Sequence, residues 1–247
     1  MEDKDNFSSG SVLSTRNINL VGFYAAILTA VTTIVTFGIA MIALPISGAF
    51  CTDGCIEYPY LNTVSQFPND YSWMFPAIFL IIFYMILMVS IHSYATRQKK
   101  IFSLIGVSFA IVAVVILVGN YFVQLSVIPI SLINGETNGI AILTQYNPHG
   151  LFIVLEDLGY LIMSISFLFM APVFANKDRL DLSVKWVFIS GFILTIVSLV
   201  VISFIYGMDR KDRFEVLAIS VNWLVLLING ILLSIIFRRE LNKNGRW

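Results

Sequence analysis

Residues 148–174 read Pro-His-Gly-Leu-Phe-Ile-Val-Leu-Glu-Asp-Leu-Gly-Tyr-Leu-Ile-Met-Ser-Ile-Ser-Phe-Leu-Phe-Met-Ala-Pro-Val-Phe. This apolar run is long enough to cross a bilayer, because about 20 helical residues span a hydrocarbon core of about 30 Å. It also carries two adjacent carboxylates, Glu156 and Asp157. An ionisable side chain at the bilayer centre costs roughly 2.5–3.5 kcal/mol on insertion scales. We therefore expect both to face a protein interior or a water-filled cavity.

The composition of the whole chain is that of a membrane protein. Of its 247 residues 58% are hydrophobic and 12% are charged, and the mean hydropathy is +0.87. Soluble domains carry about 25% charged residues. The formal net charge is zero, which leaves no electrostatic footprint of nucleic-acid binding.

Six apolar segments are expected to cross the membrane as helices, at about residues 18–47, 73–95, 101–128, 151–174, 185–206 and 216–237. A polar tail, residues 1–17, precedes them, and a basic tail, residues 238–247, follows. The first segment is longer than the 7–15-residue core of a cleavable signal, so we expect it to be retained. No ten-residue alternation typical of a barrel appears. The sequence predicts an all-α bundle of six spans, bent in its third span at Gly119 or Pro129.

The basic residues predict the orientation. Most of the 15 Lys and Arg residues lie in the two tails and in the connections after the second and fourth spans, whereas residues 48–72 and 130–150 contain none. By the positive-inside rule both termini are cytoplasmic, in a multi-pass protein of the cell membrane. The exception is the turn after the fifth span, which this topology puts outside. It interleaves Arg210, Lys211 and Arg213 with Asp209, Asp212 and Glu215, so the turn is expected to neutralise its own charge.

Polar side chains cluster in the outer part of the predicted bundle. Glu156, Asp157, Tyr160 and Ser164 fall within about 100° of arc on one helix, and the carboxylates lie roughly 8 Å from its outer end. The third span adds Asn120 and Gln124, and the sixth adds Asn222. These positions favour an outward-facing polar pocket for a small ligand, a proton or a cation. Its predicted lining is Glu156, Asp157, Tyr160, Asn120, Gln124 and Asn222.

The alternative is structural. The carboxylates would then lie at the water line, and the amides would hold helices together through contacts that average about 0.6 kcal/mol. Successive side chains on a helix diverge, so Glu156 and Asp157 are not expected to form a tight proton-sharing pair with each other.

Two cysteines lie in the first outer loop, in the segment Cys51-Thr-Asp-Gly-Cys55. Outside the membrane, a small disulfide loop turned by Gly54 is the preferred interpretation, and free thiols are the alternative. A Cys/Cys/His metal site with His149 is disfavoured because the pair lacks a second cysteine pair. The sequence predicts no metal site and no cofactor.

Three function classes stay open. No phosphate-binding loop, zinc helix or nucleophile elbow is present, so no catalytic residue is assigned. Binding or transport of a small ligand or ion is preferred. The alternatives are a membrane-embedded enzyme that uses Glu156 or Asp157 on a lipid-like substrate, and a scaffold protein. Membrane lipids are expected partners, and transport by so short a chain would indicate a homo-oligomer.

The segment Gln124–Phe174 carries Pro129, Asn-Gly-Glu, Asn-Pro and Leu-Glu-Asp-Leu-Gly-Tyr elements. In these it resembles small multi-span prokaryotic membrane proteins with six helices. The resemblance brings no activity with it, so no functional residues are transferred.

Overall fold

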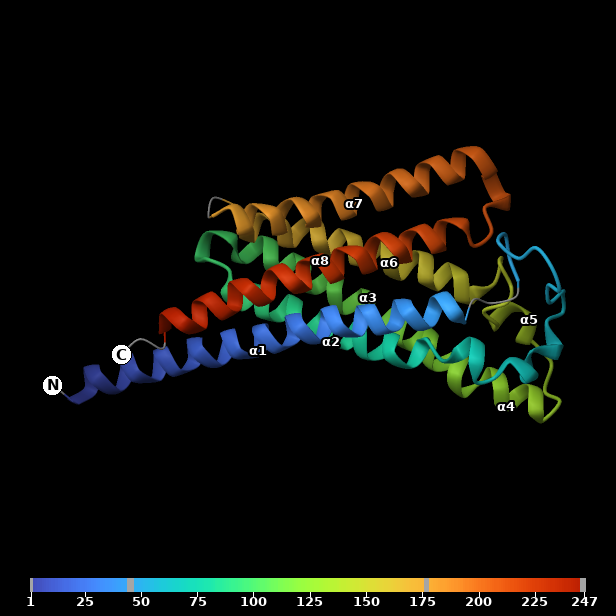
Figure 1. Cartoon of the computed structure of the whole chain (residues 1–247), viewed down its shortest axis with the longest axis horizontal. Helices are drawn as coiled ribbons and strands as arrows, with labels where there is room; N and C mark the ends of the chain where they lie inside the picture. The colour runs from blue at the N-terminus through green and yellow to red at the C-terminus, as the bar shows by residue number, and fades with distance from the viewer. Residues whose placement is uncertain (1, 44–46, 176–177, 245–247) are drawn as a thin grey trace.

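The computed structural model describes residues 2–43, 47–175 and 178–244, and over these ranges it is all-helical. Figure 1 shows its long helices, which are α1 (Glu2–Ile42), α2 (Met74–Tyr94), α3 (Lys100–Ser126), α6 (Leu151–Met170), α7 (Arg179–Tyr206) and α8 (Arg213–Asn244). Within the described ranges, six helical stretches are long and apolar enough to cross a membrane. The predicted six-helix membrane bundle is therefore confirmed.

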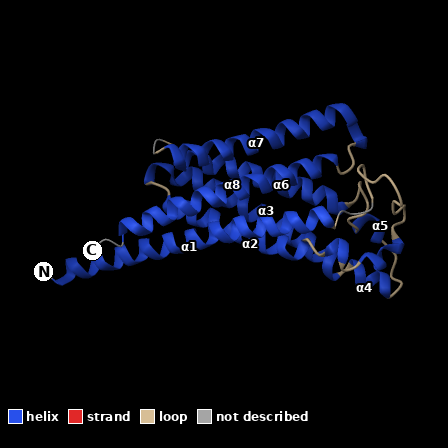
Figure 2. Cartoon of the chain, in the orientation of Figure 1, coloured by secondary structure: helices blue, strands red, loops and turns tan. Residues whose placement is uncertain are grey.

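The long helices form a ring. Each packs against its neighbours in the order α1, α2, α3, α6, α7 and α8, and α8 closes the ring on α1. The start of α1 and the end of α8 lie at the same end of the bundle (Figure 1). The opposite end, here called the loop end, is built from residues 47–73, 127–150 and 207–212 (Figure 2). The site described below lies at the loop end.

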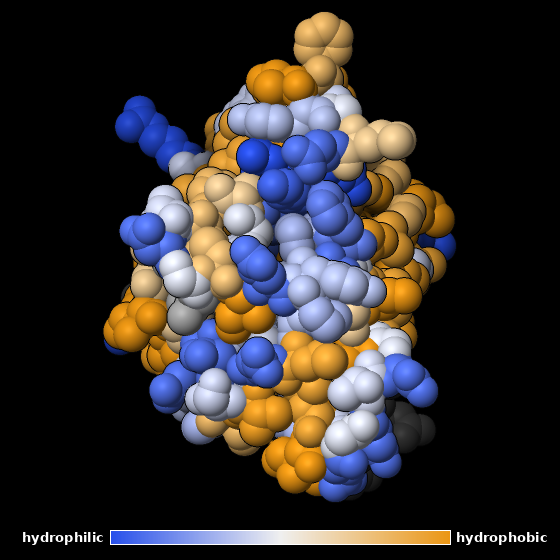
Figure 3. Space-filling model, turned by 90° about the vertical axis from the view of Figure 1, so that its right-hand side faces the viewer, coloured by the Kyte–Doolittle hydropathy of each residue, from blue (hydrophilic) through white to orange (hydrophobic). Residues whose placement is uncertain are grey.

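Short helices organise the connections. The loop end contains η1 (Leu61–Gln66), η2 (Asn69–Tyr71), α4 (Ile128–Ile133), α5 (Ile140–Leu143) and η5 (Gly207–Asp209), and the other end contains η3 (Arg97–Lys99) and η4 (Ala171–Phe174). Seen end-on in Figure 3, polar side chains gather over the upper middle of the loop end, and apolar and polar side chains alternate over its lower part.

The helix boundaries differ from the predicted spans for local reasons. The first helix starts at Glu2, so it extends through the polar tail, and it ends at Ile42, before the predicted boundary at about 47; residues 44–46 lie outside the described residues. The third span ends at Ser126, and Pro129 lies in the first turn of the separate helix α4, where proline is tolerated. Gly119 lies inside the uninterrupted α3.

The fifth span starts earlier than predicted because Asp178 caps α7. Its Oδ1 accepts hydrogen bonds from the backbone N–H groups of Leu180 and Asp181, both at 3.0 Å. An aspartate at this position satisfies N–H groups that have no partner within the helix. The other oxygen, Oδ2, pairs with Arg239 of α8 at 2.8 Å, so one side chain joins the beginning of α7 to α8.

Small residues bring α1 and α8 together. A Cβ atom on Gly230 would lie 2.9 Å from the backbone oxygen of Ala26 and 3.0 Å from the Cβ of Ala30, which is the close approach that small residues allow between membrane helices.

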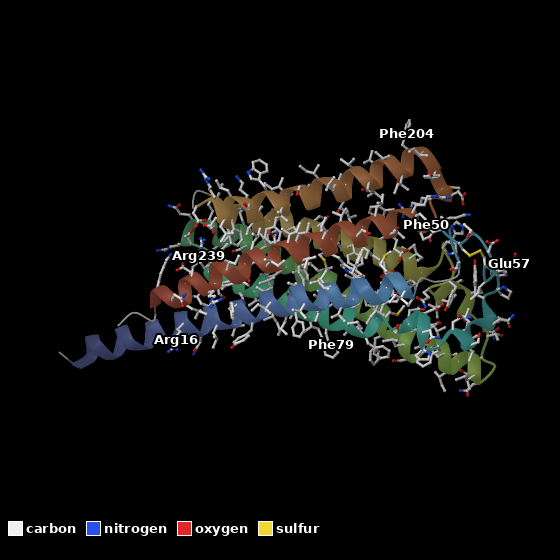
Figure 4. All side chains as sticks on the ribbon, viewed as in Figure 1. Arg16, Phe50, Glu57, Phe79, Phe204 and Arg239 are labelled. Carbon is white, nitrogen blue, oxygen red and sulfur yellow. A yellow bond between two sulfur atoms is a disulfide. The ribbon has the colours of Figure 1, made fainter. Side chains whose placement is uncertain are left out.

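Large apolar side chains point away from the ring of helices. Phe79 of α2 and Phe204 of α7 project outward in Figure 4, and Phe204 is 90% exposed. Their environment in a bilayer would be lipid.

Candidate functional site

Glu156 lies inside the bundle near the loop end and is completely buried. Its Oε1 accepts a hydrogen bond from the hydroxyl group of Tyr121 on α3 at 2.5 Å. The hydroxyl groups of Tyr121 and Tyr160 lie 2.9 Å apart, and the indole N–H of Trp223 on α8 donates to Tyr160 at 3.0 Å. Three helices thus join in one chain of hydrogen bonds that ends on a carboxylate.

The second acid of this site is Glu215, in the first turn of α8. Its carboxyl group lies close enough to that of Glu156 for each acid to affect the charge of the other. Glu156 Oε2 receives no bond from a conventional donor among the described residues. Two carboxylates share a hydrogen bond only when a proton lies between them, because an ionised carboxylate can only accept. A hydrogen bond between these two acids therefore requires that one of them carries a proton.

Asp157 points to a different partner. Its side chain is 8% exposed, and its Oδ2 accepts a hydrogen bond from Arg210 at 3.0 Å. Arg210 lies in the turn between α7 and α8, among the basic residues that were the exception to the predicted topology. Arg210 at the loop end is therefore the counter-ion of the buried carboxylate of Asp157.

A pocket of about 200 Å³ opens beside Glu215. It lies between the end of α1, the beginning of α8, and the segments that precede α2 and α6. The side chains that matter below are aromatic, acidic or small: Phe37, Phe50, Trp73, Phe152, Trp223, Asp212, Glu215 and Ser220. Trp223 and Glu215 belong both to this lining and to the buried network. Through them the pocket touches Glu156.

The three predicted amides take other roles. Asn120 donates to the backbone oxygen of Phe152 at 3.0 Å. Gln124 contacts the loop before α6 twice, as donor to Leu143 O and as acceptor from Gln145 N. Asn222 donates to Ala218 O at 2.8 Å and to the hydroxyl group of Thr195 on α7 at 3.4 Å. These bonds fit the structural interpretation of the amides, and they connect helices and loops.

Four side chains of this arrangement were not among the predicted site residues: Tyr121, Trp223, Glu215 and Arg210. Tyr121 follows Asn120 directly, but an aromatic residue in an apolar span gives no signal of its own. Glu215 and Arg210 stood in the charged turn that was interpreted as self-neutralised. The structure gives both residues partners in α6, Asp157 for Arg210 and Glu156 for Glu215, and the alternating charges of the turn gave no signal of these partners.

Cys51 and Cys55 form a disulfide in the first loop. His149, the third ligand of the disfavoured metal site, lies with Nε2 4.0 Å from Asp209 Oδ1. In the described ranges no group of three His, Cys, Asp or Glu side chains is arranged to hold a metal ion.

Comparison of the chain with protein-family models, with curated proteins and with solved structures gave no match. The candidate site is therefore interpreted from its own geometry.

Proposed function

We propose that this membrane protein binds a small ligand in the pocket at its loop end. The observation that carries the proposal is the continuity between the pocket and the buried network. Glu215 lines the pocket and contacts Glu156, which Tyr121, Tyr160 and Trp223 hold in place. A purely structural network would not need an acid at the wall of an open cavity.

The position of the pocket supports access from outside the cell. Basic residues are concentrated at the other end of the bundle, which the positive-inside rule predicts to be cytoplasmic. The disulfide lies at the loop end, and disulfides persist in oxidising compartments. A ligand that reaches the pocket directly would then come from the extracytoplasmic side.

Tryptophan fluorescence tests the proposal. In a Trp186→Phe/Trp247→Phe variant the remaining tryptophans are Trp73 and Trp223, which both line the pocket. The probes are choline, its neutral isostere 3,3-dimethylbutan-1-ol, and the anion 3,3-dimethylbutanoate, in a detergent without choline groups. We expect at least one probe to change the emission saturably. If none of the three does, the proposal is wrong.

Filling the pocket provides the matched control. Ser220 lines the pocket, whereas Ser198 lies on exposed α7, and the two hydroxyl groups make the same 2.7 Å bond to the backbone oxygen four residues earlier. Ser220→Leu should abolish the fluorescence response, and Ser198→Leu should leave it unchanged. An unchanged response in Ser220→Leu would locate binding elsewhere and overturn the proposal.

A further inference from the structure

The walls of the pocket are aromatic on several sides. Trp223 packs edge-on against Phe37, with ring centroids 6.1 Å apart, and it also contacts Trp73 at 6.2 Å. Trp73 in turn packs against Tyr121 at 5.2 Å, which ties the wall to the buried network. Aromatic faces attract cations, and sites that recognise quaternary ammonium groups are commonly built from such rings.

The charge of the lining has one sign. Among the described residues that line the pocket, Asp212 and Glu215 are acidic, and none is Lys or Arg. Asp212 is held in place because its Oδ1 accepts the backbone N–H of Ala49 at 2.8 Å. An anionic ligand, or the phosphate of a zwitterionic lipid headgroup, would meet repulsion here without a basic partner. The chemistry of the lining therefore selects a cation.

Around Glu215, acidic side chains outnumber the cationic side chains that could pair with them. Glu156, Asp157 and Asp212 act electrostatically on Glu215. Tyr121 and Tyr160 reach Glu156 from α3 and α6 through neutral hydroxyl groups, and Arg210 is engaged by Asp157. This leaves the Glu156–Glu215 pair, with the unpaired Glu156 Oε2, without a cationic side chain of its own. The described residues form no trio of metal ligands, and a proton or an organic cation would neutralise the pair.

We propose that the ligand is a small organic cation carrying a quaternary or alkylated ammonium group, and that it displaces the proton shared by Glu156 and Glu215. This inference rests on the proposed function. The cation lies against Trp73 and Trp223 with its charge toward Glu215, and the displaced proton passes through the pocket to solvent. Cation and proton then compete for one acidic site.

Charge selectivity is the first test. Choline and 3,3-dimethylbutan-1-ol have the same shape and differ in one positive charge. We expect choline to bind about tenfold more tightly or better, the size of a desolvated cation–π and carboxylate interaction, and 3,3-dimethylbutanoate not to bind. Equal binding of the neutral isostere would overturn the inference and leave the pocket proposal intact. Binding by none of the probes would overturn both.

Proton release is the second test, and choline suits it because its charge does not titrate. In weakly buffered solution with an indicator dye we expect about one proton to appear for each choline bound. By linkage the affinity then rises about tenfold per pH unit while the pair holds its proton. Choline binding without proton release, and with an affinity independent of pH, would contradict the displacement.

Substitutions assign the proton to the pair. Glu215→Gln should weaken choline binding and remove both the proton release and the pH dependence, and Glu156→Gln should remove the proton release. Glu57→Gln, at an exposed carboxylate of the same end (Figure 4), is the control and should behave like the unmodified chain. If either pair variant releases protons normally, the assignment is wrong. Because selectivity and proton counts are measured on the unmodified chain, the inference is tested even when a variant fails to fold.

Discussion

In the buried network the hydroxyl group of Tyr121 donates a hydrogen bond to Glu156 Oε1. Replacing it with Phe leaves a buried carboxyl oxygen without its donor, and such a loss costs about 1–3 kcal/mol. We expect Tyr121→Phe to lower the free energy of unfolding by that amount, measured by denaturant titration in micelles. Tyr24→Phe is the control, since Tyr24 is 56% exposed on α1. Equal stability of the two variants would mean that the hydrogen bond contributes nothing.

The Arg210–Asp157 pair leads to a second prediction at single residues. Removing one member of a buried ion pair strands the other charge, but a third of the Arg210 side chain is exposed, so solvent reduces the cost. We expect Arg210→Gln to destabilise the fold by about 1–3 kcal/mol. Adding Asp157→Asn should recover most of the loss, because a neutral amide needs no counter-ion. A double variant whose losses simply add would show that the two side chains act independently.

From the sequence, only site residues that lie on the same predicted helix could be related to one another. Helical geometry put Glu156 and Tyr160 on the same side of one span, and the structure joins both to one network through Tyr121. The partners on other helices were beyond reach, because Arg210 is 53 positions from Asp157 and no periodicity links them. The amides of Asn120 and Gln124 bond to backbone carbonyls of Phe152 in α6 and Leu143 in α5, and the sequence does not specify which turns of these helices face α3.

At the scale of helices, the contact of α1 with α8 depends on Gly230. A methyl group there would meet the backbone of Ala26 at 2.9 Å, and backbone cannot move aside cheaply. Overpacking of this kind costs typically about 1–3 kcal/mol, so Gly230→Ala should lower the unfolding temperature. Gly38→Ala is the matched control: it is also a helical glycine, with nothing within 4 Å of the added atom. A Gly230→Ala variant as stable as Gly38→Ala would contradict the described packing.

The cap of α7 predicts a pH dependence. Hydrogen bonds from the backbone N–H groups of Asp181 and Leu180, with the ion pair to Arg239, hold the pKa of Asp178 below its ordinary value of 3.8. The stabilisation is therefore complete above that value and is lost as the pH falls through the lower pKa of the folded state. The difference in unfolding temperature between the unmodified chain and Asp178→Ala should shrink at acid pH. Asp178→Asn keeps a capping oxygen and loses the charge, so its difference should be smaller at pH 7.

The helices themselves were predictable because lipid imposes their length and polarity. The apolar runs set the number of spans, whereas their ends depend on local contacts that hydropathy does not report. Asp178 extends α7, and Pro129 opens a new helix instead of bending α3. The ring order of α1, α2, α3, α6, α7 and α8 follows the chain, so helices that are consecutive in the sequence are neighbours in the bundle; the hydropathy pattern did not predict this order.

For the whole molecule, the distribution of basic residues predicts that the loop end is outside the cell. With Cys51 and Cys55 replaced by Ser, a single cysteine at Thr137 should react with a membrane-impermeant maleimide on intact cells. A single cysteine at Asn242, near the end of α8, should react only after permeabilisation. Both positions are exposed, so accessibility within the fold does not bias the comparison. The reverse labelling pattern would show that the protein has the opposite orientation in the membrane, with the pocket on the cytoplasmic side.

The indole group of Trp223 has a consequence for where a proton can reside. An indole N–H donates and never accepts, so the oxygen of Tyr160 is always the receiving atom at that end. With the hydrogen of Tyr121 donated to Glu156, the hydrogen of Tyr160 lies between the two tyrosine oxygens. In this arrangement every hydrogen of the row points toward Glu156, so the row does not take up a proton from that acid. An exchangeable hydrogen on this acid is therefore confined to its opposite face, the one nearest water.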